Sequence, residues 1–297
     1  MSVRDFALMM AMCLVWALNN VLSKHVVSGM EVPPLFYAAA RFVIVTACTF
    51  PFLFPAPRPI WRLVLVALLM GGGNFALMFI GLKMATASSA AVVLQLGMPM
   101  TTLLSVAMLG ERIRWRRGLG IALTFGGAMA VMWDPAGFTI STGLLFVASA
   151  AFMGSLGAVL MKQMEGVKPL TFQAWVGVTS VLPLSALSFF LEPGAFETAV
   201  GAGWPFLGAL VFSALIVSLV AHTVYYMLIQ RYEANLVSAL TLMTPLATIA
   251  LGVALMGDPF GPRMAIGSAV ALTGVLIIAL RGNQVMPLLL ALRNRAE

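Results

Sequence analysis

Charged residues are scarce in this chain. They make up only 9% of its 297 residues, whereas 61% are hydrophobic and the mean hydropathy is +1.02. Soluble domains carry about 25% charged residues. A chain with so few could not cover a surface that faces water, so the composition excludes a soluble protein and predicts an integral membrane protein.

Cysteine is also scarce, and no motif of a metal site or an active site is present. Cys13 and Cys48 both lie in apolar runs, which predicts buried small side chains rather than a disulfide framework. None of the ten acidic residues falls at the midpoint of an apolar run, where an intramembrane transferase would need clustered acids for Mg²⁺. His222 has no G-x-S-x-G companion, and no H-E-x-x-H or C-x-x-C occurs. We therefore expect neither an enzyme nor a metal, cofactor or nucleic-acid ligand.

Most of the sequence consists of apolar stretches of about 20 residues, the length that spans a bilayer. Short connections of mostly 4–12 residues hold nearly all the charges and leave no room for a soluble domain. The pattern predicts an all-α integral membrane protein with ten transmembrane helices. The expected spans are residues 5–24, 33–54, 61–82, 87–109, 117–133, 141–162, 169–191, 204–230, 234–256 and 263–281.

Basic residues predict the orientation, because loops on the cytoplasmic side are enriched in lysine and arginine. If the N-terminus is cytoplasmic, 13 of the 17 basic residues lie inside and only Lys24, Lys83 and Arg263 lie outside, with Arg41 within a span. We therefore expect a multi-pass protein of the inner (plasma) membrane with both termini cytoplasmic. The stretch 282–297 is too short to span and is predicted to be a cytoplasmic tail.

The two halves of the chain repeat one pattern at a distance of about half its length. Residues 94–133 and 241–280 share the spacing of a proline and three glycines apart from one inserted residue after the second proline. The pairs are Pro99 with Pro245, Gly110 with Gly257, Gly120 with Gly267, and Gly127 with Gly274. We expect one five-helix repeat over 1–134 and a second over 135–281. Since five is odd, the repeats enter the membrane in opposite senses, and such inverted repeats place a binding site near the midplane.

Several motifs carry a family resemblance over residues 5–281. They are Trp16-x-x-Asn19-x4-Lys24, Pro34-x-Phe36-x4-Arg41-Phe42, Ser89-Ala90-Ala91 before Pro99, Gly110-Glu111-Arg112, Tyr225-Tyr226, Tyr232-Glu233-Ala234-Asn235, Pro245 and Gly257-Asp258. The pattern resembles the EamA family of the drug/metabolite transporter superfamily. Two segments, Val92-Val93-Leu94-Gln95 and Arg231-Tyr232-Glu233, are similar to the exporters of cysteine and O-acetylserine. The resemblance implies ten helices that export small metabolites, although Asp258-Pro259 departs from the usual Glu-Arg.

Polar residues within spans are candidates for substrate contact, since a polar stripe cannot face lipid without cost. On the first span Trp16, Asn19 and Asn20 share one face. Asn74 follows a run of three glycines, which permits close helix approach or local unwinding. Hydrogen bonding between helices is the alternative for the asparagines, and packing is the alternative for the glycine run.

Proline marks a break at the same position of each repeat. Gln95 lies four residues before Pro99, and proline cannot donate to its carbonyl group, so an acceptor is left free there. Thr241 and Pro245 are the equivalent pair in the second repeat. The kinks at Pro99 and Pro245 suit hinges or a midplane site, with a plain packing kink as the alternative.

Two ionisable residues lie inside spans. Arg41, about two turns into the second span, suits the carboxylate of a substrate; alternatively it extends to the outer surface or pairs with an acid such as Glu31. His222 and Tyr226 share a face, and an intramembrane histidine can contact substrate or take up a proton, although a lone histidine is more often structural.

These residues favour a transporter of a zwitterionic or anionic small molecule that works by alternating access. We expect an exporter of amino acids or their derivatives, with the lipid bilayer as its surroundings. The alternative is an exporter of drugs or other cationic compounds, which calls for a buried carboxylate that this chain lacks. The sequence does not specify the oligomeric state or the energy coupling.

Overall fold

The computed structural model describes residues 1–110, 113–134, 139–164, 167–232, 237 and 240–279. These residues are almost entirely helical. Within them, the other regular structure is an antiparallel pair of two-residue strands, β1 (Trp133–Asp134) and β2 (Thr139–Ile140), which joins the two halves of the chain. The prediction of an all-helical protein is confirmed apart from this short pair. Glu111, Arg112, Glu233, Asn235 and the predicted tail 282–297 lie outside the described residues.

The first half of the chain contains seven α-helices interrupted by short π and 3₁₀ turns. Its elements are α1 (Val3–Lys24), η1 (His25–Gly29), α2 (Pro34–Thr49), η2 (Phe50–Leu53), α3 (Ile60–Leu68), η3 (Leu69–Gly73), α4 (Asn74–Met84), α5 (Ala87–Val93), η4 (Leu94–Leu96), α6 (Gly97–Leu109) and α7 (Trp115–Met132).

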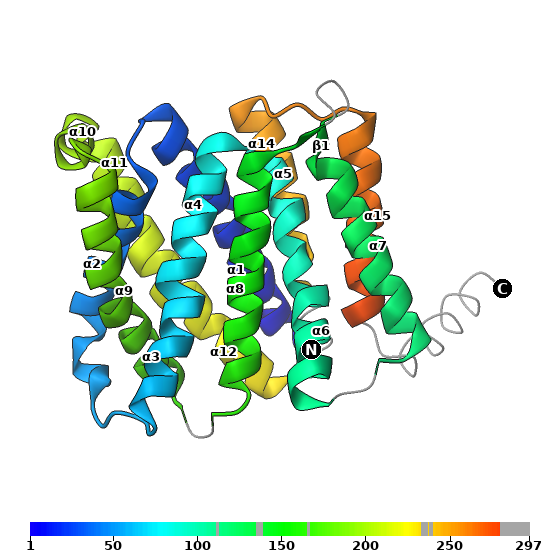
Figure 1. Ribbon diagram of the computed structural model, residues 1–297, viewed down its shortest axis with the longest axis horizontal. Coiled ribbons are helices and arrows are strands. Elements are labelled where there is room, and N and C mark those ends of the chain that lie inside the picture. Colours follow the sequence, from blue (N-terminus) through cyan, green and yellow to red (C-terminus); the bar gives the residue numbers. More distant parts are fainter. Residues whose placement is uncertain (111–112, 135–138, 165–166, 233–236, 238–239, 280–297) are drawn as a thin grey trace.

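The second half also consists of α-helices, one of which continues into a π-helical segment. Its elements are α8 (Thr142–Met161), α9 (Pro169–Leu191), α10 (Ala195–Gly201), α11 (Gly203–Val211), η5 (Phe212–Ala221), α12 (His222–Arg231), α14 (Met243–Met256) and α15 (Pro262–Ala279). Most of the long helices run side by side along one direction, and α10, β1 and the turn between α14 and α15 lie at the same end of the bundle (Figure 1).

Eight continuous helical segments are long and apolar enough to cross a membrane. They coincide with eight of the ten predicted spans. The other two predictions, 117–133 and 234–256, correspond to α7 and α14. The first turn of α7 carries Arg116 and Arg117, which lowers its mean hydropathy, and α14 has only 14 described residues. The fold is thus that of a multi-pass membrane protein with at least these eight candidate spans.

The glycine run at 71–73 forms a close contact between helices. A Cβ atom on Gly71 would lie 2.6 Å from Val176 Cγ1 of α9, and the Gly72 amide donates to Ser180 Oγ at 2.8 Å. Both predicted features are present, since these residues form the π turn η3 and also approach α9 closely. The bonded Gly72 amide contributes to packing and is not available to a substrate.

Helices α7 and α15 pack against each other in antiparallel fashion through the repeated glycines. A Cβ atom on Gly120 would lie 2.7 Å from the carbonyl oxygen of Gly274, and one on Gly127 would lie 2.5 Å from that of Gly267. Under the repeat, the contact of Gly120 with Gly274 maps onto the contact of Gly267 with Gly127. The two contacts therefore exchange with each other when each glycine is replaced by its equivalent in the other half, as in a contact with twofold symmetry.

The paired glycines 110 and 257 end equivalent helices. Gly110 closes α6 with φ 68° and Gly257 closes α14 with φ 67°, a left-handed conformation that glycine adopts without steric cost. The repeated glycine of the sequence therefore has a direct structural cause in both halves.

Candidate substrate-binding site

Arg41 lies deep in the bundle on α2 and is only 1% exposed. Its Nε and Nη2 atoms donate to Ser218 Oγ of η5 at 3.1 and 2.9 Å, and its guanidinium lies 4.5 Å from the centre of the Phe75 ring on α4. In the part of the chain that the structure describes, no carboxylate lies within 4.0 Å of it. The predicted alternatives of extension to the surface or pairing with Glu31 are wrong.

The partners of Arg41 hold the group in place but leave its positive charge uncompensated. A serine hydroxyl and an aromatic face are both neutral, and Nη1 is buried without a hydrogen-bond partner among the described residues. A buried cation without a counter-charge is costly, and anything negative that enters the bundle at this point is stabilised by it. Ser218 Oγ accepts from Arg41 and donates to the carbonyl group of Ser213, so its hydroxyl is fully used.

Trp16 of α1 contacts the ring of His222. The ring centres are 5.3 Å apart, and Tyr225 lies 5.4 Å from Trp16 on the same side. His222 Nδ1 is 2.7 Å from the carbonyl oxygen of Val217, so Nδ1 carries a hydrogen and donates it to this oxygen. The Trp16 Nε1–H group is buried without a partner. This contact therefore leaves the Trp16 donor unused among the described residues.

The pairs Arg41–Ser218 and Trp16–His222 belong to one cluster. Ser218 and His222 are four residues apart on a continuous helix and so share a face. Helices α1 and α2 both pack on η5, and α1 also packs on α12. The structure thus brings together Trp16, Arg41 and His222, which lie far apart in the sequence.

The two asparagines of the first span have different surroundings. Asn20 Nδ2 donates to Thr248 Oγ1 of α14 at 3.3 Å, so Asn20 makes the interhelical hydrogen bond that was the alternative for this pair. Asn19 is buried, and its Oδ1 atom has no hydrogen-bond partner. Of the two, Asn19 offers an unused acceptor to a ligand.

Three other predicted residues lie apart from this cluster or cannot be placed. Asn74 Nδ2 donates to the carbonyl oxygen of Ala150 at 2.6 Å, which ties α4 to α8. Gln95 is half-buried in η4, which packs on α8, and no hydrogen bond of the described residues joins it to Arg41 or His222. The side chain of Tyr226 lies outside what the structure describes, and Tyr225 is the tyrosine beside Trp16.

The two candidate hinge prolines occupy equivalent places. Pro99 is the third residue of α6, directly after the 3₁₀ turn η4, and Pro245 is the third residue of α14. In the first turn of a helix the amide of a proline would have no partner anyway, so both residues fit without disrupting a longer helix. The 3₁₀ turn η4 precedes α6, and two turn residues, Thr241 and Leu242, precede α14; a role of either proline as a hinge stays a prediction.

Sequence reasoning missed Ser218 and Phe75. A signal for Ser218 exists in its spacing of four residues from His222, which places both on the same helical face. The sequence position of Phe75 gives no comparable signal, because its contact with Arg41 depends on how closely α4 approaches α2.

At each end of the bundle, hydrogen bonds join the two halves of the chain. At the end near the N-terminus, Tyr232 Oη donates to Asp5 Oδ2 at 2.7 Å and accepts from the Ser2 amide at 3.1 Å. At the opposite end, Asp258 Oδ2 accepts from the Ser88 amide at 2.9 Å, as expected for an acid that caps a helix. Each contact joins a segment of the first half to one of the second.

The chain is similar to known transporters over most of its length. Residues 6–133 and 141–280 each match the EamA-like transporter family. A protein of Escherichia coli (strain K12), described as a probable amino-acid metabolite efflux pump, is 26% identical over 93% of this chain and 95% of its own. A protein of Salmonella typhimurium with the same description is also 26% identical, with the same coverage.

A solved crystal structure has the same fold. It superposes with a TM-score of 0.63 at 20% identity, and the match covers 93% of this chain and 96% of the other.

Proposed function

Because the chain belongs to the EamA-like transporter family, we propose that it exports amino acids or closely related metabolites across the inner membrane. The observation that carries this proposal is the buried guanidinium of Arg41, which no described carboxylate neutralises. Relatives described as probable amino-acid metabolite efflux pumps support the same class of substrate.

The unused polar atoms of the cluster, together with Asn19 one turn beyond Trp16 on α1, match the groups of an amino acid. Arg41 Nη1 and Trp16 Nε1 are buried donors suited to a carboxylate, and Asn19 Oδ1 is a buried acceptor suited to an ammonium group. A charge-assisted bond from guanidinium to carboxylate is stronger than one between neutral groups. A purely cationic substrate would meet a like charge here, which argues against the alternative of a drug exporter.

Alternating access would follow from an inverted repeat. The reciprocal glycine contacts of α7 and α15 support the ten-helix arrangement with repeats at 1–134 and 135–281, since two copies related by an axis in the membrane plane meet in this way. In this mechanism the bonds from Tyr232 to Asp5 and from Ser88 to Asp258 would open in turn. The breaks before Pro99 and Pro245 would serve as hinges.

Transport by proteoliposomes tests the role of Arg41. We expect Arg41→Gln to weaken transport of an amino acid about 10- to 150-fold, because a hydrogen bond to a charged group contributes about 1.5–3 kcal/mol. Transport of the corresponding amide should fall much less. Arg62→Gln, which removes an arginine at the start of α3, is the matched control and should transport both compounds normally.

Two results would contradict the proposal. If acid and amide fall by the same factor in Arg41→Gln while the protein remains monodisperse, Arg41 has a structural role. If the wild-type protein releases cationic dyes but none of a panel of amino acids, the drug-exporter alternative is correct.

A further inference from the structure

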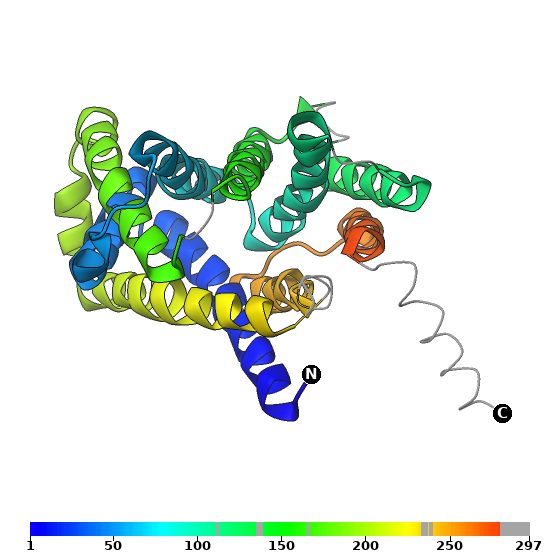
Figure 2. The same ribbon diagram turned by 90° about the horizontal axis from the view of Figure 1, so that it is seen from below.

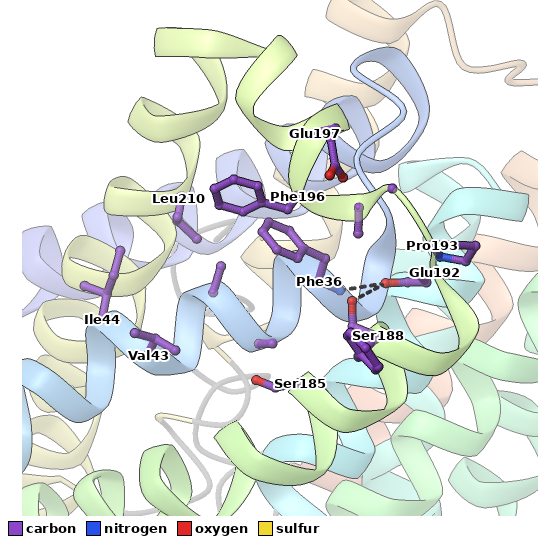
Figure 3. A pocket seen from close by; sticks show the side chains of 15 residues that line it. Phe36, Val43, Ile44, Ser185, Ser188, Glu192, Pro193, Phe196, Glu197 and Leu210 are labelled. Carbon is purple, nitrogen blue, oxygen red and sulfur yellow. Dashed lines mark hydrogen bonds between the residues drawn. The ribbon is translucent and has the colours of Figure 1, made fainter.

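A groove of about 840 Å³ opens on the side of the bundle, and its lining does not include Arg41, Ser218, Trp16 or His222. It lies between α2, α9, α10 and α11, as Figure 3 shows. Most of its lining is apolar, including Val43, Ile44 and Leu210, while two carboxylates, Glu192 and Glu197, lie toward the other end. A volume of this size is typical of sites that hold a small organic molecule.

The apolar part of the groove faces lipid. Its helices α2, α9 and α11 belong to candidate membrane spans, and on its rim Val43 is 49% and Phe189 is 79% exposed. Hydrocarbon surrounds such a surface in a bilayer, so the occupant of an apolar groove at this depth is an acyl chain rather than water.

The polar end of the groove carries one carboxylate that the protein uses and one that it does not. Glu192 accepts from the amides of Leu35 and Phe36 at 2.9 and 2.8 Å and so caps α2. Its Oε2 atom also accepts from Ser188 Oγ at 2.9 Å. Glu197 of α10 is exposed and has no hydrogen bond or ion pair within the described residues.

The negative charge of the two carboxylates at this end favours some lipid head groups over others. The lining contains two carboxylates and no lysine or arginine. An ammonium group would be attracted to Glu197, whereas a head group with only negative charge would be repelled and would find no cation.

We propose that this groove binds one phospholipid with a primary ammonium in its head group, that is, a phosphatidylethanolamine. One acyl chain lies between α2 and α9, and the ammonium lies at Glu197. This site is separate from the substrate cluster and does not depend on the identity of the transported compound.

Native mass spectrometry of the detergent-solubilised full chain, incubated with an equimolar mixture of phosphatidylethanolamine and phosphatidylglycerol, tests the proposal. We expect wild-type protein to retain one phosphatidylethanolamine in preference to phosphatidylglycerol. Glu197→Gln should reduce this retention about 2- to 5-fold, since an exposed charge pair contributes up to about 1 kcal/mol. Ala40→Trp, which fills the groove, should abolish it.

Matched controls separate the groove from the general lipid surface. Glu31→Gln removes another carboxylate, and Leu255→Trp adds an indole at an exposed position of α14; both should retain the lipid as wild type does. Equal retention of the two lipids, or retention unchanged in Glu197→Gln and Ala40→Trp, would overturn the proposal. Displacement of the lipid by a transported amino acid would overturn it too, because the groove would then be an entrance for substrate.

Discussion

Arg41 shows how a single residue can remain charged inside an apolar bundle. Two of its nitrogen atoms are held by the hydroxyl of Ser218, and its flat face lies against Phe75. These contacts fix the direction of the guanidinium without cancelling its charge. The sequence identified Arg41 as the cation in the second span, but the contacts that orient it come from α4 and η5.

Ser218→Ala tests this orientation. The substitution removes the acceptor of two guanidinium N–H groups and should raise the KM for an amino acid about 10-fold or more, with a smaller effect on its amide, because bonds to charged groups contribute about 1.5–3 kcal/mol. Ser218→Thr, which keeps the hydroxyl, should restore transport. Ser213→Ala is the matched control, since the Ser213 hydroxyl is buried without a partner. Equal KM values for Ser218→Ala and Ser213→Ala would show that Ser218 does not position Arg41.

At the scale of elements, the contact between α7 and α15 depends on the absence of side chains. Cβ atoms on Gly127 or Gly274 would collide with backbone atoms of the facing helix, which cannot move without separating the two helices. Close approach of helices through small residues is a common device in membranes, where lipid offers no hydrophobic driving force.

The substitutions Gly127→Ala and Gly126→Ala, at adjacent positions of α7, test the close packing of α7 against α15. A Cβ atom at Gly127 meets the backbone of Gly267 and Ala271, whereas one at Gly126 meets nothing within 4 Å. We expect Gly127→Ala to destabilise the fold by about 1–3 kcal/mol through overpacking. Gly126→Ala should leave stability unchanged or raise it slightly, because alanine favours a helix over glycine. Melting of the detergent-solubilised protein measures both, and equal melting temperatures would contradict the observed packing.

At the scale of the whole molecule, the helices α7 and α15 run in opposite directions. The helices α7 and α15 are equivalent in the repeat, yet their N-termini lie at opposite ends of the bundle (Figure 1). Seen from below, α15 lies beside α7 (Figure 2). The bias of basic residues toward one side predicts that both termini are cytoplasmic.

Labelling with a membrane-impermeant maleimide in intact cells tests the orientation. Cys13 and Cys48 are first replaced by alanine, since both are free thiols. A cysteine at Gly261, before α15, should be labelled, whereas one at Arg114, before α7, should react only after the cells are opened. Both positions are exposed, so a missing reaction reports the side of the membrane and not burial. The reverse pattern would invert the predicted topology.

Local properties of the sequence determined the class of the protein. Hydropathy over about 20 residues predicted the eight segments that the structure shows as candidate spans. The spacing of Pro99, Gly110, Gly120 and Gly127 with their equivalents predicted a repeat, and the motifs of both halves predicted the EamA family, which is confirmed. Such features depend on composition and on the conformation of a few neighbouring residues, and both can be predicted from the amino-acid sequence.

Only the tertiary structure decided which polar residues meet. Trp16, Asn19 and Asn20 share a face by spacing, but Trp16 contacts His222 of α12 while Asn20 bonds to Thr248 of α14. Asn74 resembled the other candidates in sequence, yet it bonds to α8. A helical face is wide enough to touch two or three neighbours, so the partner of each side chain depends on how the helices pack. Packing is set by contacts between residues more than a hundred positions apart, such as Arg41 and Ser218, and the order of residues in one chain does not display them.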